Sequence, residues 1–128
     1  MSGSFSQELL GAAWLAGERQ ARPLSLRLLV RPRLGPWAAR GALRVGDWLD
    51  GAAVSGRLLP CPRRGPALTY ELGFVDPGEG PLELVAHLRP RWVNPVASLT
   101  TLEGSVRAGS RREVARVLLR WDLRRGVA

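Results

Sequence analysis

Residues 24–32 read LSLRLLVRP and place an apolar side chain at every second position. One face of this stretch carries Leu24, Leu26, Leu28 and Val30. The other face carries serine and arginine, with Leu29 as its one apolar residue. Successive side chains of a β-strand point to opposite faces, so a period of two predicts a strand that is buried on one side. Pro23 and Pro32 bracket this strand.

The same alternation returns in the middle of the chain, on both sides of a turn. Residues 67–75, ALTYELGFV, and residues 82–89, LELVAHLR, have apolar side chains at alternate positions. The segment between them, DPGEGP at 76–81, is rich in residues that favour turns. Together they predict a β-hairpin. Residues 98–107 and 113–123 flank AGSRR and predict a second hairpin.

The region between the first strand and the first hairpin is less regular. Residues 34–51 are turn-rich and give no clear element, although we expect Trp37 and Trp48 to anchor loops or strand ends. Residues 52–60 can form a strand in which Gly56 marks a bulge or a close approach of two backbones.

Turn signals recur along the chain and no strand–helix alternation is present. This pattern is typical of an antiparallel all-β fold. We expect one domain over residues 1–128, an antiparallel β-sandwich or flattened barrel of about seven to eight strands, with room for one short helix. At this length the chain can bury a core without disulfides or metals.

Two segments fit a helix as well as a strand. The opening FSQELLGAAWLAG, residues 5–17, has good helix formers and an apolar stripe at helical spacing, but Gly11 and Gly17 oppose a helix. Residues 113–123, EVARVLLRWDL, alternate imperfectly. Their content of valine and tryptophan and their place after AGSRR favour a strand.

Several short motifs follow one another in the order seen in a known family. FSQELLG is similar to an FTExMxG-type opening, and residues 24–30 resemble the alternating strand that follows it. Leu68, Tyr70, Leu72 and Phe74 match an M-x-Y-x-L-x-F strand. Gly80, Pro81, Leu82 and Leu84 resemble a G-x-P-L-x-L segment. Leu99, Thr100, Thr101 and Leu102 resemble a D-T-T-T-L strand. Residues 113–123 resemble a closing strand that ends near an aspartate, here Asp122.

These motifs resemble the accessory β domain that accompanies bacterial glucose–methanol–choline oxidoreductases of the cholesterol-oxidase type. The resemblance covers most of the chain and implies that residues 5–17 form an edge or closing strand. Some family positions differ: a glycine–aromatic–lysine is replaced by Ala86, His87 and Leu88, and the first two residues of D-T-T-T-L are Ser98 and Leu99. Any role of those polar residues is therefore not carried over.

The oxidoreductases of that family need a flavin-binding domain, which this chain lacks. A dinucleotide fold requires G-x-G-x-x-G after a strand. Here Gly78-Glu79-Gly80 is followed by Pro81, lies in a predicted turn and lacks the third glycine. The resemblance therefore implies a standalone accessory module, without a cofactor and without oxidoreductase activity of its own.

The net charge of +8 suggests an anionic partner, such as nucleic acid. However, all basic residues are arginine, and the chain contains neither lysine nor isoleucine. A GC-rich genome imposes this composition through codon choice, so part of the arginine excess need not reflect function. No apolar run approaches the roughly 20 residues of a membrane span. No secretory signal is expected, because Glu8 interrupts the first apolar run, and the cytoplasm is the default location.

Few residues offer catalytic chemistry. His87 is the one histidine and is expected on the face opposite the leucines, where a partly exposed structural histidine is the simpler interpretation. Cys61 is the one cysteine, lies between two prolines and excludes an internal disulfide. No spacing of histidines, cysteines or carboxylates predicts a metal site. The carboxylates are expected to form cross-strand pairs with arginines.

The five tryptophans are many for this length. They can be core and loop anchors, or they can line a site for a flat apolar ligand such as a lipid or sterol. The candidate ligand-binding residues are Trp14, Trp37, Trp48, Tyr70, Trp92, Trp121 and His87.

Three functions are compatible with the sequence. The first is a non-catalytic accessory or binding module, for an apolar ligand or a separately encoded oxidoreductase. The second is a basic protein that binds nucleic acid or an anionic surface. The third is a small hydrolase or isomerase built on a β-barrel, which requires His87 and a carboxylate in one pocket.

Overall fold

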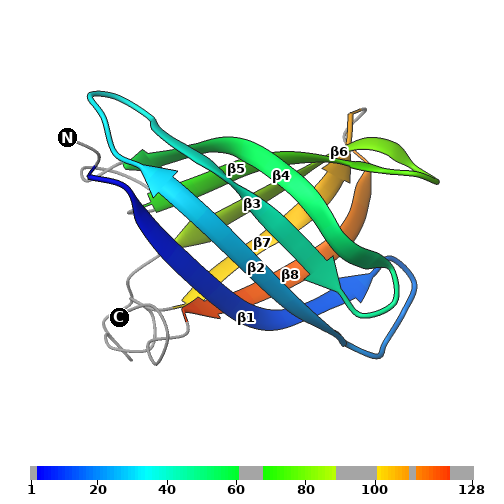
Figure 1. The fold of residues 1–128 in the computed structure, drawn as a ribbon. Helices are drawn as coiled ribbons and strands as arrows, with labels where there is room; N and C mark the ends of the chain where they lie inside the picture. Colours follow the sequence, from blue (N-terminus) through cyan, green and yellow to red (C-terminus); the bar gives the residue numbers. More distant parts are fainter. Residues whose placement is uncertain (1–2, 61–67, 89–100, 110–111, 122–128) are drawn as a thin grey trace.

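The computed structural model describes residues 3–60, 68–88, 101–109 and 112–121. They form a closed antiparallel barrel in which each strand pairs with the next and the last pairs with the first (Figure 1). The strands are β1 (Phe5–Leu15), β2 (Arg22–Arg31), β3 (Trp37–Val45), β4 (Leu49–Pro60), β5 (Leu68–Asp76), β6 (Gly80–Leu88), β7 (Thr101–Ala108) and β8 (Glu113–Trp121). The expected all-β fold is confirmed, in its barrel form. The described residues contain no helix, and so none long and apolar enough to cross a membrane.

Strand β1 closes the barrel. It pairs with β2 on one side and β8 on the other, so that Leu9 lies opposite both Leu26 and Trp121. The strand implied by the family resemblance is confirmed, and the helical interpretation of residues 5–17 is wrong. Within these residues, Leu9 and Ala13 are buried while Leu10 is exposed, as a strand requires. Strand β8 is confirmed in the same way.

Strand β3 was not predicted. Its inward positions include Ala39, Gly41, Leu43 and Val45, and two of these four are too small to make the alternation visible in the sequence. Both predicted hairpins are present, as β5–β6 and β7–β8. Residues 98–100, with which the second predicted hairpin begins, lie outside the described residues.

The inside of the barrel is filled by aliphatic side chains. Seven leucines have no exposed surface: Leu9, Leu26, Leu43, Leu58, Leu72, Leu84 and Leu102. They come from each of the strands β1 to β7, and Leu119 of β8 is 1% exposed. A side chain without accessible surface leaves no space for a water molecule beside it. A barrel of eight strands is just wide enough for its side chains to fill, and here they do so around these leucines.

Four glycines at inward positions let neighbouring strands approach closely. They are Gly11, Gly41, Gly56 and Gly104. A Cβ at Gly41 would lie 1.7 Å from the carbonyl oxygen of Arg27, and one at Gly56 would lie 1.9 Å from that of Glu71. Glycine at such points allows a sheet to curve into a closed barrel. The close approach predicted at Gly56 is confirmed.

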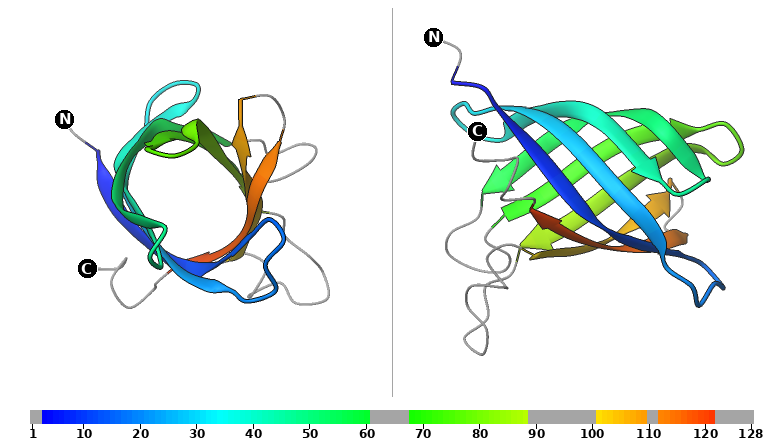
Figure 2. Two further views of the ribbon diagram at one scale, coloured as in Figure 1. Left: turned by 90° about the vertical axis from the view of Figure 1, so that its right-hand side faces the viewer. Right: turned by 60° about the horizontal axis from the view of Figure 1, so that its bottom comes forward.

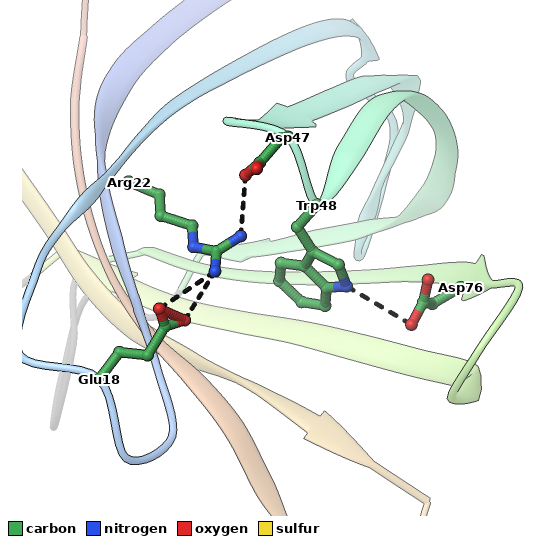
Figure 3. A network of polar contacts seen from close by, with 5 residues as sticks. All are labelled: Glu18, Arg22, Asp47, Trp48 and Asp76. Carbon is green, nitrogen blue, oxygen red and sulfur yellow. Dashed lines mark hydrogen bonds and ion pairs between the residues drawn. The ribbon is translucent and has the colours of Figure 1, made fainter.

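A network of polar contacts lies at the end of the barrel where β1–β2, β3–β4 and β5–β6 turn (Figure 3). Arg22 donates to Glu18 at 2.8 Å and to Asp47 at 2.9 Å. The hydrogen bond to Glu18 raises the pKa of the Arg22 guanidinium. The Trp48 indole donates to the buried carboxylate of Asp76 at 3.4 Å. These contacts tie the three turns together and confirm Trp48 as a turn anchor.

Candidate functional site: a basic wall and an exposed loop

Charge is divided unequally between two sides of the barrel. Strands β2, β3 and β4 contain six arginines and one aspartate. Strands β5 to β8 contain three arginines and five carboxylates. We call the outward side of β2–β4 the basic wall and the outward side of β5–β8 the mixed wall.

The register of the basic wall places small side chains opposite its arginines. Arg31 lies opposite Ala38, and Arg27 opposite Ala42. Arg40 lies between Leu29 of β2 and a serine of β4. No carboxylate lies beside these guanidinium groups on the three strands, so they extend over a surface made of alanine, serine and leucine.

Three arginines of the basic wall lie beside carboxylates of a neighbouring strand. Arg57 contacts Glu71 of β5 at 2.8 Å, and Arg44 contacts Asp50 at 3.3 Å. Arg27 lies 3.8 Å from Glu8 of β1. These pairs confirm the expected strand-to-strand neutralisation.

Arg31 and Arg40 have no such partner. Within the described part of the chain neither forms an ion pair, and both are exposed. Leu29, which lies between them on the surface, is 39% exposed. An exposed leucine beside two free guanidinium groups is the strongest unsatisfied feature of this surface.

Two shallow grooves meet at this point. One has a volume of about 700 Å³ and runs across β1 to β4 at Gly41, while the other, of about 560 Å³, runs across β2 to β4 at Gly56. Leu29 and Arg40 line both grooves. Each groove lies where an inward glycine draws two strands together, so the glycines that close the barrel also shape its outer surface.

The loop between β2 and β3 projects from the same surface. Its sequence is PRLGP, residues 32–36, and the Leu34 side chain at its tip is fully exposed, at 103%. Arg33 Nε donates to the Pro36 carbonyl at 3.3 Å, and Gly35 takes a φ of +85°. Proline fixes φ, so the two prolines, the turn glycine and the hydrogen bond together define the loop shape.

Aromatic residues support this end of the barrel from inside. Trp37 begins β3 directly after the loop and packs edge-to-face on Phe5, with ring centroids 6.3 Å apart. Tyr70 is buried and donates its hydroxyl proton to Gln7 Oε1 at 2.9 Å, which links β5 to β1 across the barrel. Burial raises the pKa of Tyr70 to about 12, although Gln7 and the nearby Trp121 oppose this shift.

The Trp121 indole N–H is buried beside this hydroxyl. It has no acceptor at normal hydrogen-bonding geometry in the part of the chain that the structure describes. Its influence on Tyr70 is therefore that of a nearby dipole.

The mixed wall carries a different groove, of about 810 Å³, across β6, β7, β8 and β1. Trp14, His87, Glu103, Arg107 and Arg116 are among its lining residues. Its two arginines are interspersed with three glutamates, so it lacks the positive excess of the basic wall.

His87 occupies the outer face, as expected. Its Nδ1 lies 3.0 Å from Thr69 Oγ1, and Glu103 is its cross-strand neighbour. This is a polar row across three strands, and His87 is neither isolated nor fully exposed. Among the described residues, no cluster of three or more histidine, cysteine or carboxylate groups is arranged to hold a metal ion.

The structure distributes the candidate ligand-binding residues over four places. Trp14 and His87 share the mixed-wall groove, and Tyr70 and Trp121 meet inside the barrel. Trp37 packs on Phe5 below the loop, and Trp48 lies in the network at the opposite end. Trp92 and Cys61 lie outside the described residues.

The residues of the basic wall were not chosen from the sequence. Leu29 was the apolar exception on a polar face, and Arg31 and Leu34 belong to the RPRLGPW run that follows it. The exposed leucine in β2 and the arginine-containing run after it, together with the outward arginines of β3, are the sequence features that indicate this surface. Comparisons with protein families, curated proteins and solved structures find no match to this chain.

Proposed function

We propose that this chain is a non-catalytic binding module whose basic wall docks on an anionic surface. The observation that carries the proposal is the segregation of arginines, and above all the pair Arg31 and Arg40, which have no carboxylate partner in the described chain. A surface of one sign attracts an oppositely charged partner and loses that attraction as salt screens it.

Two further features support binding on the outside of the barrel. The interior is filled around its leucines, which favours an outer surface over an enclosed apolar ligand. A closed barrel has no free strand edge to which a partner can add a strand. A partner must therefore meet side chains and loops, and β2–β4 contain six arginines where β5–β8 contain three.

The test compares two matched pairs of substitutions. Arg31→Gln with Arg40→Gln removes two charges from the basic wall, and Arg116→Gln with Arg120→Gln removes two exposed charges from the mixed wall. Binding is measured to duplex DNA, to poly-glutamate and to anionic vesicles, at several salt concentrations.

We expect salt-sensitive binding to at least one of these partners, weakened about tenfold or more by the basic-wall pair and at most about threefold by the other. Equal losses from both pairs would mean that overall charge, not the wall, causes the binding. No binding to any of the three would contradict the proposal.

A further inference from the structure

We propose that the anionic surface is a lipid bilayer, and that the loop at residues 32–36 inserts Leu34 among its headgroups. This inference rests on the proposed function and names the partner of the same site. Insertion into a bilayer requires an apolar anchor and cations placed around that anchor. The surface should also suit a bilayer better than it suits nucleic acid.

The anchor is the side chain of Leu34. It is completely exposed at the tip of a loop that stands outside the ring of strands when the barrel is viewed end-on (Figure 2). The loop shape is fixed by Pro32, Pro36 and the hydrogen bond from Arg33. Little conformational freedom is lost when such a loop inserts, which favours binding.

The cations lie directly around the anchor. Arg31 and Arg33 are three and one positions away from the tip, respectively, and Arg40 lies on the wall behind it. From residue 31 to residue 44 the chain contains four arginines and no carboxylate. An anionic bilayer has a negative surface potential, so a cationic surface without acidic residues suits it. An apolar group inserted at the interface adds affinity to this attraction.

Other anionic partners explain less of the surface. Bases of single-stranded nucleic acid stack on exposed aromatic rings, and the described outward positions of β2–β4 carry none. The two rings beside the loop, Trp37 and Phe5, pack edge-to-face on each other, and Trp37 is half-buried. A phosphate backbone also gives an exposed leucine nothing to contact. A lipid surface uses both the leucine and the arginines.

The experiment measures cosedimentation of the full chain with vesicles. One set contains phosphatidylcholine and phosphatidylglycerol, and the other contains phosphatidylcholine alone. Leu34→Ser removes the anchor, and Leu118→Ser is the control because Leu118 is a partly exposed leucine of the mixed wall. Neither side chain lies in the core, so both variants keep the fold, which circular dichroism checks.

We expect binding to the anionic vesicles, a loss of about tenfold for Leu34→Ser and less than about twofold for Leu118→Ser. The pair Arg31→Gln and Arg40→Gln should lose about thirtyfold, since each arginine near an anionic membrane contributes about a factor of five.

The possible failures separate the two proposals. Binding to DNA or poly-glutamate, but not to anionic vesicles, would overturn the lipid inference and leave the proposed function standing. Vesicle binding that Leu34→Ser does not change would overturn the insertion of the loop. Equal binding to neutral vesicles would overturn the role of the headgroup charge. Absence of binding to all three anionic partners would overturn both proposals.

Discussion

The basic wall and the mixed wall are built on the same interior and differ in what they show to the outside. Leu26 and Leu43 of one wall and Leu84 of the other are all without exposed surface. Outside, the strands of the first wall contain six arginines and one aspartate, whereas the second wall intersperses arginines with glutamates in one groove. Barrel closure thus requires a small or apolar residue at the inward positions. The outward positions are not constrained in this way, and their charges can differ from one wall to the other.

The largest loss of stability is expected at the inward glycines, because both walls depend on them for the close approach of neighbouring strands. Gly41→Ala on the basic wall and Gly104→Ala on the mixed wall place a Cβ 1.7 and 2.0 Å from a backbone oxygen. Each should lower the free energy of unfolding by about 3 kcal/mol or more, because backbones cannot give way as side chains do.

Gly73→Ala is the control for both, since its Cβ would lie 3.7 Å from the nearest atom, an ordinary contact. It should cost less than about 1 kcal/mol. Urea unfolding measures all three variants. If Gly41→Ala behaved like Gly73→Ala, the strands would not approach as closely as the structure has them.

The second effect concerns the hydrogen bond that crosses the interior from Tyr70, on β5 of the mixed wall, to Gln7 on β1. Tyr70 has its pKa raised to about 12 by burial, from an ordinary value of 10. The folded state therefore holds the phenolic proton more tightly than the unfolded state. Its contribution to stability is complete below pH 10 and is lost as the pH rises from 10 to about 12. The loss is at most about 3 kcal/mol, at 1.36 kcal/mol for each pKa unit.

Absorbance measures this titration directly, because Tyr70 is the one tyrosine of the chain. A midpoint near 12 is expected while the chain is folded, and Tyr70→Phe should remove this part of the pH dependence of unfolding. A midpoint near 10 in the folded protein would show that the hydroxyl is open to water.

A smaller effect is expected at the end of the barrel that joins the walls through its turns. Asp76 accepts hydrogen bonds from Trp48 Nε1 and from the backbone N–H of Glu79. Asp76→Ala leaves both donors without this acceptor and should cost about 1–2 kcal/mol. Asp47→Ala removes an exposed partner of Arg22 and should cost less than about 1 kcal/mol. Thermal unfolding distinguishes the two, and equal costs would contradict the burial of Asp76.

The smallest effect is expected from a substitution at the border between the two walls. Glu71 neutralises Arg57 at 2.8 Å, so Glu71→Gln extends the basic wall by one free arginine. Stability should change by less than about 1 kcal/mol, because the pair is exposed. Binding to anionic vesicles should strengthen about threefold. Glu103→Gln makes the same charge change on the mixed wall, and an equal gain there would show that position does not matter.

Much of the fold could be predicted from the sequence. Period-two alternation identifies β2, β5 and β6 because their inward residues are large and their outward residues polar. Strand β3 escaped prediction because Ala39 and Gly41 hide the same alternation. In β1, good helix formers suggested a helix, and pairing with both β2 and β8 overrides that local preference.

The site could be predicted only in part. The aromatic residues chosen as one candidate ligand site lie in four separate places. Their positions along the strands do not show which strands will be neighbours. The basic wall depends on that order: Arg31 and Arg40 become neighbours of Leu29 only once β2 and β3 pair in this register. Net charge alone does not reveal that its arginines gather on one side.

The most direct test of the account is arginine footprinting of the bound protein. The chain has 19 arginines and no lysine, so phenylglyoxal modification read by mass spectrometry reports its basic surface one residue at a time. On the anionic surface that the protein binds most tightly, the account predicts that Arg31, Arg33 and Arg40 are protected. Arg116 and Arg120 should react as fast as in the free protein. Uniform protection, or protection of Arg116 and Arg120 instead, would contradict docking through the basic wall.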